Sequence, residues 1–161
     1  MSLVKKPRGC LKSSFPHTKF EIRNPKSESF MDKFELEKRT KRFALKIIEF
    51  VATLSQTRTC AIIEYQLVKS GTSVGANYRE ANRAESRADF IHKVAIVEKE
   101  CSESGYWLEI CEEAHLGNTE LRTWLSQEAR ELLAIFTSIG RSTKSNRASA
   151  GAASTERNRA V

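Results

Sequence analysis

Proline is missing from the long middle of this 161-residue chain, because Pro7, Pro16 and Pro25 all lie within the first thirty residues. Glycine is scarce in the same stretch, and both residues disfavour helix interiors. No apolar run approaches the roughly 18 residues needed to cross a bilayer. The basic N-terminus also has no apolar stretch of the kind that secretory signals carry. The sequence therefore predicts a helical protein of the cytoplasm that has no membrane partner.

Motifs for catalysis or cofactor binding are missing too. The four cysteines, Cys10, Cys60, Cys101 and Cys111, form no CxxC pair, so in a reducing compartment we expect free thiols. The chain has no phosphate loop, no dinucleotide-binding glycine pattern and no zinc signature. We therefore expect no enzymatic activity and no cofactor.

Two pairs of residues raise the question of a metal, because each places a carboxylate and a histidine one helical turn apart. Asp89 and His92 form one pair, and Glu112 and His115 form the other. Di-iron bundles place such pairs on two different helices, whereas both pairs here fall in one predicted helix, about 34 Å apart at 1.5 Å per residue. We therefore expect no metal, and a ferritin-like metal enzyme is the least favoured alternative.

Positive charge is concentrated at the two ends of the chain, although the net charge is +7 overall. Residues 1–30 carry seven Lys and Arg against two Glu, and residues 141–161 carry five against one. Residues 31–140 carry 15 basic and 17 acidic residues. The end segments are also rich in small and polar residues, which is typical of chain that does not fold by itself. We predict a flexible basic extension over 1–30, a folded body over 31–141 and a flexible basic tail over 142–161.

The body contains four stripes of mainly apolar residues that recur in alternating steps of three and four, the spacing of bundle helices. Residues suited to helix caps separate the stripes at 55–59, 86–89 and 117–119. Loops this short make neighbouring helices antiparallel. The sequence therefore predicts an all-α, up-down-up-down antiparallel four-helix bundle. The stripes comprise Leu36, Thr40, Phe43, Ile47, Phe50 and Leu54; Cys60, Ile63, Leu67, Ser70, Val74, Asn77 and Ala81; Phe90, Val94, Val97, Cys101, Ser104, Leu108, Cys111 and His115; and Leu121, Leu125, Glu128, Leu132, Ile135 and Ile139. Neighbouring apolar residues are expected to widen the core, namely Ile48, Val51, Ile62, Ile91, Leu133 and Phe136.

Small residues crowd the second predicted helix. Gly71 and Gly75 lie one turn apart, although each glycine costs a helix about 1 kcal/mol, and they would let another helix approach closely. We favour tight packing inside the bundle, with a contact between subunits as the alternative. An amide on the core stripe also needs hydrogen-bond partners when it is buried. The residues considered for close packing or for oligomer contact are Gly71, Ser73, Gly75, Asn77 and Glu80.

Basic residues on the first predicted helix and near the end of the second are candidates for binding nucleic-acid phosphates. They are Lys38, Arg39, Lys41, Arg42, Lys46, Arg79, Arg83 and Arg87. The favoured alternative is a solvated face that Glu35, Glu37 and Glu49 balance. Binding through such residues would be directed at the backbone and sensitive to salt.

Several segments carry a family resemblance. Residues 72–81 (TSVGANYREA), 86–93 (SRADFIHK), 106–108 (YWL) and 135–139 (IFTSI) closely resemble the four-helix bundle proteins of bacterial 23S ribosomal RNA intervening sequences. The resemblance covers roughly residues 31–145. It implies a fold similar to the accessory protein of diversity-generating retroelements and assembly into ring-shaped homopentamers. That accessory protein is a basic barrel that binds a reverse transcriptase and nucleic acid, and the balanced charge of this body departs from it.

Taken together, the residues and the resemblance predict a non-enzymatic homo-oligomer, pentameric by resemblance. We expect it to act as a scaffold or adaptor for RNA, DNA or protein in a setting associated with ribosomal RNA. The alternative is an accessory protein that binds the reverse transcriptase of a diversity-generating retroelement.

Overall fold

The computed structural model describes residues 22–23 and 30–157, with side chains for residues 32–144. Cys10 and most of the predicted basic extension over 1–30 lie outside these residues. The described residues before the bundle include two strands of two residues each. Strand β1 (Ile22–Arg23) pairs antiparallel with β2 (Phe30–Met31), so that Ile22 faces Met31. The sequence analysis did not predict this pair.

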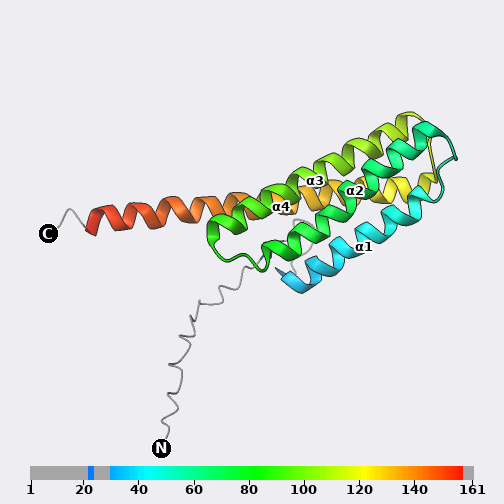
Figure 1. Ribbon diagram of the computed structural model, residues 1–161. Helices are drawn as coiled ribbons and strands as arrows, with labels where there is room; N and C mark the ends of the chain where they lie inside the picture. The colour runs from blue at the N-terminus through cyan, green and yellow to red at the C-terminus, as the bar shows by residue number, and fades with distance from the viewer. Residues whose placement is uncertain (1–21, 24–29, 158–161) are drawn as a thin grey trace, which may run out of the picture.

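Four long helices make up the body, and consecutive helices run in opposite directions side by side (Figure 1). The predicted up-down-up-down four-helix bundle is therefore confirmed. None of the helices in residues 30–157 combines the length and apolar character needed to cross a membrane. The helices are α1 (Lys33–Val51), α2 (Arg58–Ala81), α3 (Arg87–Glu113) and α4 (Thr119–Arg157).

Polar caps begin the last three helices at the predicted positions. The Thr57 hydroxyl accepts a hydrogen bond from the Cys60 backbone N–H at 3.1 Å, and the Ser86 hydroxyl accepts one from Asp89 N–H at 3.1 Å. Before α4, the side-chain carbonyl oxygen of Asn118 accepts from Leu121 N–H at 3.0 Å. Each bond satisfies a backbone donor that the first helical turn leaves unpaired. These caps fix where the short loops end.

The core follows the predicted stripes closely, and the clearest differences lie at Asn77, His115, Ile48 and Ile62. On α2 the buried residue is Tyr78, and Asn77 is only half-buried. The reason is helix geometry, since 18 residues make five turns and place Tyr78 directly in line with Cys60. His115 is exposed beyond the end of α3. Ile48 and Ile62, expected to widen the core, are 50% and 56% exposed.

Helix α4 extends past residue 141, where the folded body was predicted to end. Thr143 is still buried, 2% exposed, and the helix continues to Arg157. Fourteen further residues correspond to about 21 Å of helix. In Figure 1 this part of α4 projects beyond the end of the bundle at which α1 begins and α2 turns into α3. Residue 141 therefore lies inside a continuous helix.

Candidate functional site

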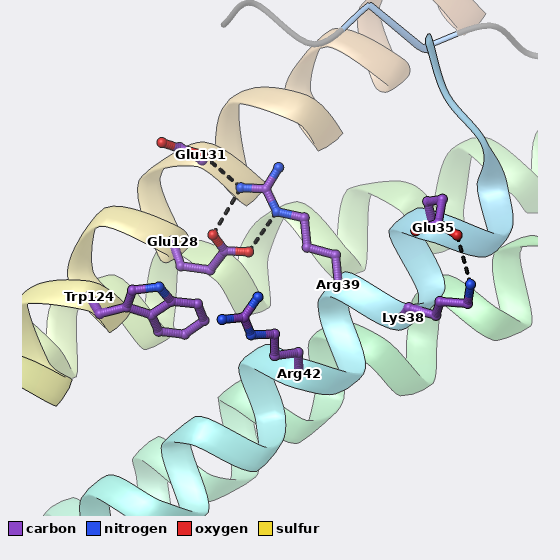
Figure 2. Close-up of a pocket in the computed structure, with 7 residues that line it drawn as sticks. All are labelled: Glu35, Lys38, Arg39, Arg42, Trp124, Glu128 and Glu131. Carbon is purple, nitrogen blue, oxygen red and sulfur yellow. Dashed lines mark hydrogen bonds and ion pairs between the residues drawn. The ribbon is translucent and has the colours of Figure 1, made fainter. Parts of the chain in front are cut away.

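Arg39 lies at the seam between α1 and α4, where its guanidinium group meets two carboxylates (Figure 2). Its Nε donates to Glu128 at 2.6 Å, and its Nη2 donates to Glu128 at 2.9 Å and to Glu131 at 2.7 Å. The Arg39 side chain is 18% exposed, and the hydrogen bond to Glu128 raises its pKa. A forked, partly buried arrangement of this kind is among the stronger polar contacts in proteins. Arg39 therefore ties two helices together and has little capacity left for a phosphate.

A shallow hollow surrounds this ion pair, and Figure 2 shows how its walls are built from α1 and α4. The Arg42 guanidinium group stands over the Trp124 ring, 5.2 Å from its centre, in a cation–π contact. Lys38 pairs with Glu35 at 2.7 Å. The hollow is lined by Glu35, Lys38, Arg39, Arg42, Trp124, Glu128 and Glu131. Three acidic and three basic side chains balance one another, so the hollow lacks the positive excess that an anion would need.

Two more of the predicted basic residues have acidic partners. Lys46 pairs with Glu49 at 2.6 Å, and Arg79 lies 4.0 Å from Glu37. The structure therefore places Lys38, Arg39, Lys46 and Arg79 in ion pairs with carboxylates. Exposed pairs of this kind contribute little to stability, but each cancels a charge locally. Lys41 is exposed and has no ion pair among the described side chains.

Arg83 and Arg87, the last two of the candidate phosphate-binding residues, lie around the turn from α2 to α3. The Arg87 guanidinium group donates from Nη2 to the backbone carbonyl of Thr143 on α4. This contact brings Arg141 and Lys144, both exposed on α4, to the same end of the bundle. The sequence analysis missed these two residues because it placed them at the edge of a flexible tail. The signal that would have found them is the helical register of Ile135 and Ile139, which continues to Thr143.

The small residues of α2 pack within the bundle. A Cβ atom on Gly71 would lie 2.0 Å from Ile47 Cδ1 on α1, and one on Gly75 would lie 3.4 Å from Thr40 Oγ1. Backbone therefore approaches side chain closely along the α1–α2 contact. Half-buried Ser73 supplies the backbone carbonyl to which the Asn77 amide donates at 2.9 Å.

Glu80, the last of the residues considered for close packing or for oligomer contact, faces α3. Its carboxylate accepts a hydrogen bond from Lys93 Nζ at 2.5 Å. This bond lowers the pKa of Glu80 and raises the pKa of Lys93, because each charge stabilises the other. The contact joins α2 to α3 near the end of the bundle at which Arg83 lies.

The thiols of the described part of the chain are buried, and the histidines belong to no metal-binding cluster there. Cys101 and Cys111 are buried, and burial raises the pKa of Cys111 to about 11 and also raises the pKa of Cys101. Both thiols are therefore uncharged at neutral pH and pack as small apolar groups. Across residues 32–144, no three His, Cys, Asp or Glu side chains gather closely enough to hold a metal ion.

Large apolar side chains are exposed on α1 and α2. Leu45 is 57% exposed and Tyr65 is 65% exposed, besides Ile48 and Ile62. The core beneath them is complete, because Ile47 and Ile63 fill it from the adjacent positions. We refer to Leu45, Ile48, Ile62 and Tyr65 as the α1–α2 apolar surface. Where exposed apolar side chains form a continuous patch on a folded domain, they often mark an interaction site.

A comparison with protein families covers most of the bundle. The profile described as 23S rRNA-intervening sequence protein matches residues 32–138. This chain belongs to that family. A solved structure from Bacteroides thetaiotaomicron, described as a protein with unknown function from the S23 ribosomal protein family, is 33% identical with a TM-score of 0.60. The alignment covers 65% of this chain and 97% of that one.

No curated protein matches the chain. The family match ends at residue 138, so Arg141, Lys144 and the projecting part of α4 lie beyond the region that defines the family.

Proposed function

We propose that this protein is a non-catalytic homo-oligomer whose subunits assemble through the α1–α2 apolar surface and which serves as a scaffold or adaptor for nucleic acid or protein. The observation that carries the proposal is the half-exposed apolar set on two adjacent helices, between 50% and 65% exposed. Burying a fully exposed apolar side chain contributes about 1.5–3 kcal/mol, so burying one that is half-exposed contributes roughly half of that. Several together are enough to drive association.

A second copy of the chain is the occupant that we favour for this surface. The resemblance to bundles that form ring-shaped homopentamers supports self-association through a repeated contact. A ring needs two different surfaces on each subunit, because each copy contacts its two neighbours through opposite sides. The α1–α2 apolar surface supplies one of them.

The adaptor role is supported by the family's association with intervening sequences of 23S rRNA. The charge of the body, 15 basic against 17 acidic residues over 31–140, is unlike a strongly basic barrel. For this reason we place a scaffold or adaptor ahead of a reverse-transcriptase accessory protein.

Light scattering coupled to size-exclusion chromatography tests the assembly. We expect the unmodified chain to elute with the mass of an oligomer at micromolar concentration, and the Ile48→Glu/Tyr65→Glu variant to elute as a monomer. Tyr106→Glu is the matched control, because Tyr106 is 56% exposed but lies on α3. Circular dichroism should show that all three chains remain helical.

Two results would contradict the proposal. One is an unmodified chain that is monomeric at micromolar concentration. The other is an oligomer whose mass is unchanged in the Ile48→Glu/Tyr65→Glu variant, which would place the contact on another surface.

A further inference from the structure

We infer that the end of the bundle formed by the α2–α3 turn and by α4 at its exit binds the sugar-phosphate backbone of a nucleic acid. The site comprises Arg83, Arg87, Arg141 and Lys144, which we call the basic end. The inference names nucleic acid as the partner of the proposed adaptor. It rests on the proposed function only in taking the protein to act as an adaptor. It does not depend on oligomer assembly.

Three elements bring the basic end together. Arg83 lies in the turn between α2 and α3, and Arg87 begins α3. The bond from Arg87 to the Thr143 carbonyl fixes the first turn of α3 beside α4. Further along the two helices, Val94 lies 3.9 Å from where a Cβ of Gly140 would stand. Lys144 follows Thr143 directly, so it lies alongside the start of α3.

The charges of the basic end are not cancelled by neighbouring carboxylates. Arg83, Arg141 and Lys144 are exposed, and none has an ion pair among the described side chains. Arg87 donates to a neutral carbonyl, so it keeps its full positive charge. This distinguishes the basic end from the hollow around Arg39, where acidic and basic side chains are equal in number.

Few carboxylates oppose the basic end. Glu80 pairs with Lys93 at 2.5 Å, whereas Asp89 lies in the first turn of α3 and has no ion pair among the described side chains. Glu98 accepts a hydrogen bond from the Thr137 hydroxyl at 2.6 Å. Glu85, exposed in the α2–α3 turn, is the acidic residue that lies between Arg83 and Arg87 in the chain. Four basic side chains against Asp89 and Glu85 leave a positive excess.

The projecting part of α4 favours a nucleic acid over a protein partner. Residues 145–157 contain no Leu, Ile, Val, Phe, Met, Trp or Tyr, and they carry two Arg against one Glu. A segment without large apolar residues offers the apolar groove of a protein little to bury. A helix of 13 residues is about 20 Å long, enough to run past several phosphates of one duplex strand, which are spaced about 3.4 Å along the duplex axis.

Fluorescence anisotropy with the full chain tests the site, using labelled single-stranded RNA and labelled duplex DNA of mixed sequence as probes. Arg141→Glu/Lys144→Glu is expected to weaken binding about tenfold or more at low salt. The plot of log K against log salt concentration should also become shallower, by about 0.7–0.9 for each phosphate that the variant no longer neutralises. Arg83→Glu should shift binding in the same direction.

The matched control is Arg58→Glu/Arg130→Glu, which changes the net charge equally at exposed arginines of α2 and α4 away from the basic end. It should leave affinity within about twofold, since long-range effects of exposed charges are screened by salt. Equal weakening in the control and in Arg141→Glu/Lys144→Glu would overturn the inference, because only net charge would matter. Undiminished binding by Arg141→Glu/Lys144→Glu would also overturn the inference and would assign the binding to the N-terminal extension. The absence of binding by the unmodified chain would overturn it as well.

Light scattering on the same variants separates this inference from the proposed assembly. We expect Arg141→Glu/Lys144→Glu to keep the mass of the unmodified chain. A monomeric chain that still binds the probes through the basic end would contradict the assembly and leave the site standing. A salt-sensitive loss of oligomer in Arg141→Glu/Lys144→Glu would instead show that the basic end contacts another copy, and would overturn the site.

Discussion

Arg39 joins two helices through contacts with Glu128 and Glu131, which lie 89 and 92 residues further along the chain. Because the Arg39 and Glu128 side chains are only 18% and 12% exposed, water competes less for their hydrogen bonds than at the exposed pair of Lys38 and Glu35. The two pairs therefore differ in energy although both join Arg or Lys to Glu.

Replacing Arg39 by methionine should lower the free energy of unfolding by about 1.5–3 kcal/mol, the range for hydrogen bonds to charged groups. The change keeps much of the apolar stem while it leaves Glu128 without its main donors. Lys38→Met is the control and should cost less than about 0.5 kcal/mol, because its pair is exposed. Urea unfolding followed by circular dichroism measures both.

A double-mutant cycle between Arg39→Met and Glu128→Gln checks the assignment. The coupling energy should be about 1 kcal/mol or more, as expected of residues in direct contact. Additive effects would mean that the two side chains do not interact in solution.

The sequence predicted that Arg39 belonged to a basic cluster but could not predict its partners. The local charge of a helix says nothing about which residue of a distant helix lies opposite. The caps are the opposite case. Thr57 and Ser86 lie in the predicted cap segments 55–59 and 86–89, and each caps a backbone N–H only three positions away.

Between elements, α2 and α1 come into close contact at Gly71. A Cβ at this position would meet Ile47 Cδ1 at 2.0 Å. Gly105 on α3 provides the opposite case, since a Cβ there would meet nothing within 4 Å. The two glycines occupy similar helix interiors and differ in the space beside them.

Gly71→Ala should therefore destabilise the bundle by about 1–3 kcal/mol through overpacking. Gly105→Ala should stabilise it by about 0.5–1 kcal/mol, because alanine favours the helix over glycine. Thermal and urea unfolding of the two variants measure the difference.

Ile47→Val removes the clashing methyl group, so the Gly71→Ala/Ile47→Val variant should be more stable than the sum of its single changes predicts. If Gly71→Ala were as stable as the unmodified chain, α1 and α2 would not be in the close contact described.

Helices α1 to α3 were predicted well because their stripes and caps are local signals. The register failed at Asn77 because alternating steps of three and four average 3.5 residues, whereas a straight helix has 3.6 per turn and drifts over its length. The end of α4 was missed because residues after Thr143 carry no apolar stripe, and a stripe was the main evidence for helix.

At the scale of the whole molecule, assembly and folding should be linked. If copies bind through the α1–α2 apolar surface, association stabilises the folded state by mass action. Raising the protein concentration should therefore raise the Tm of the unmodified chain, and it should leave the Tm of the Ile48→Glu/Tyr65→Glu variant unchanged. Differential scanning fluorimetry over a range of concentrations measures this, and an equally constant Tm for both would argue against the linkage.

The exposed apolar surface of this molecule was harder to predict than its fold. Ile48 and Ile62 continue apolar stripes in the sequence, so they were assigned to the core, and only the neighbouring Ile47 and Ile63 fill it. The spacing of apolar residues predicts the centre of the buried face of a helix. The width of that face depends on how closely the next helix packs.

An even number of antiparallel helices has a practical consequence for labelling this protein. Helix α1 begins, and α4 leaves, at the same end of the bundle, beside Arg83 and Lys144 (Figure 1). A fluorophore or affinity handle attached just before α1, or on α4 near Lys144, would therefore sit at one pole and crowd the nucleic acid proposed for the basic end. A reporter attached in the loop around Gly117 would occupy the opposite pole, and two reporters on a single subunit would span the length of the bundle.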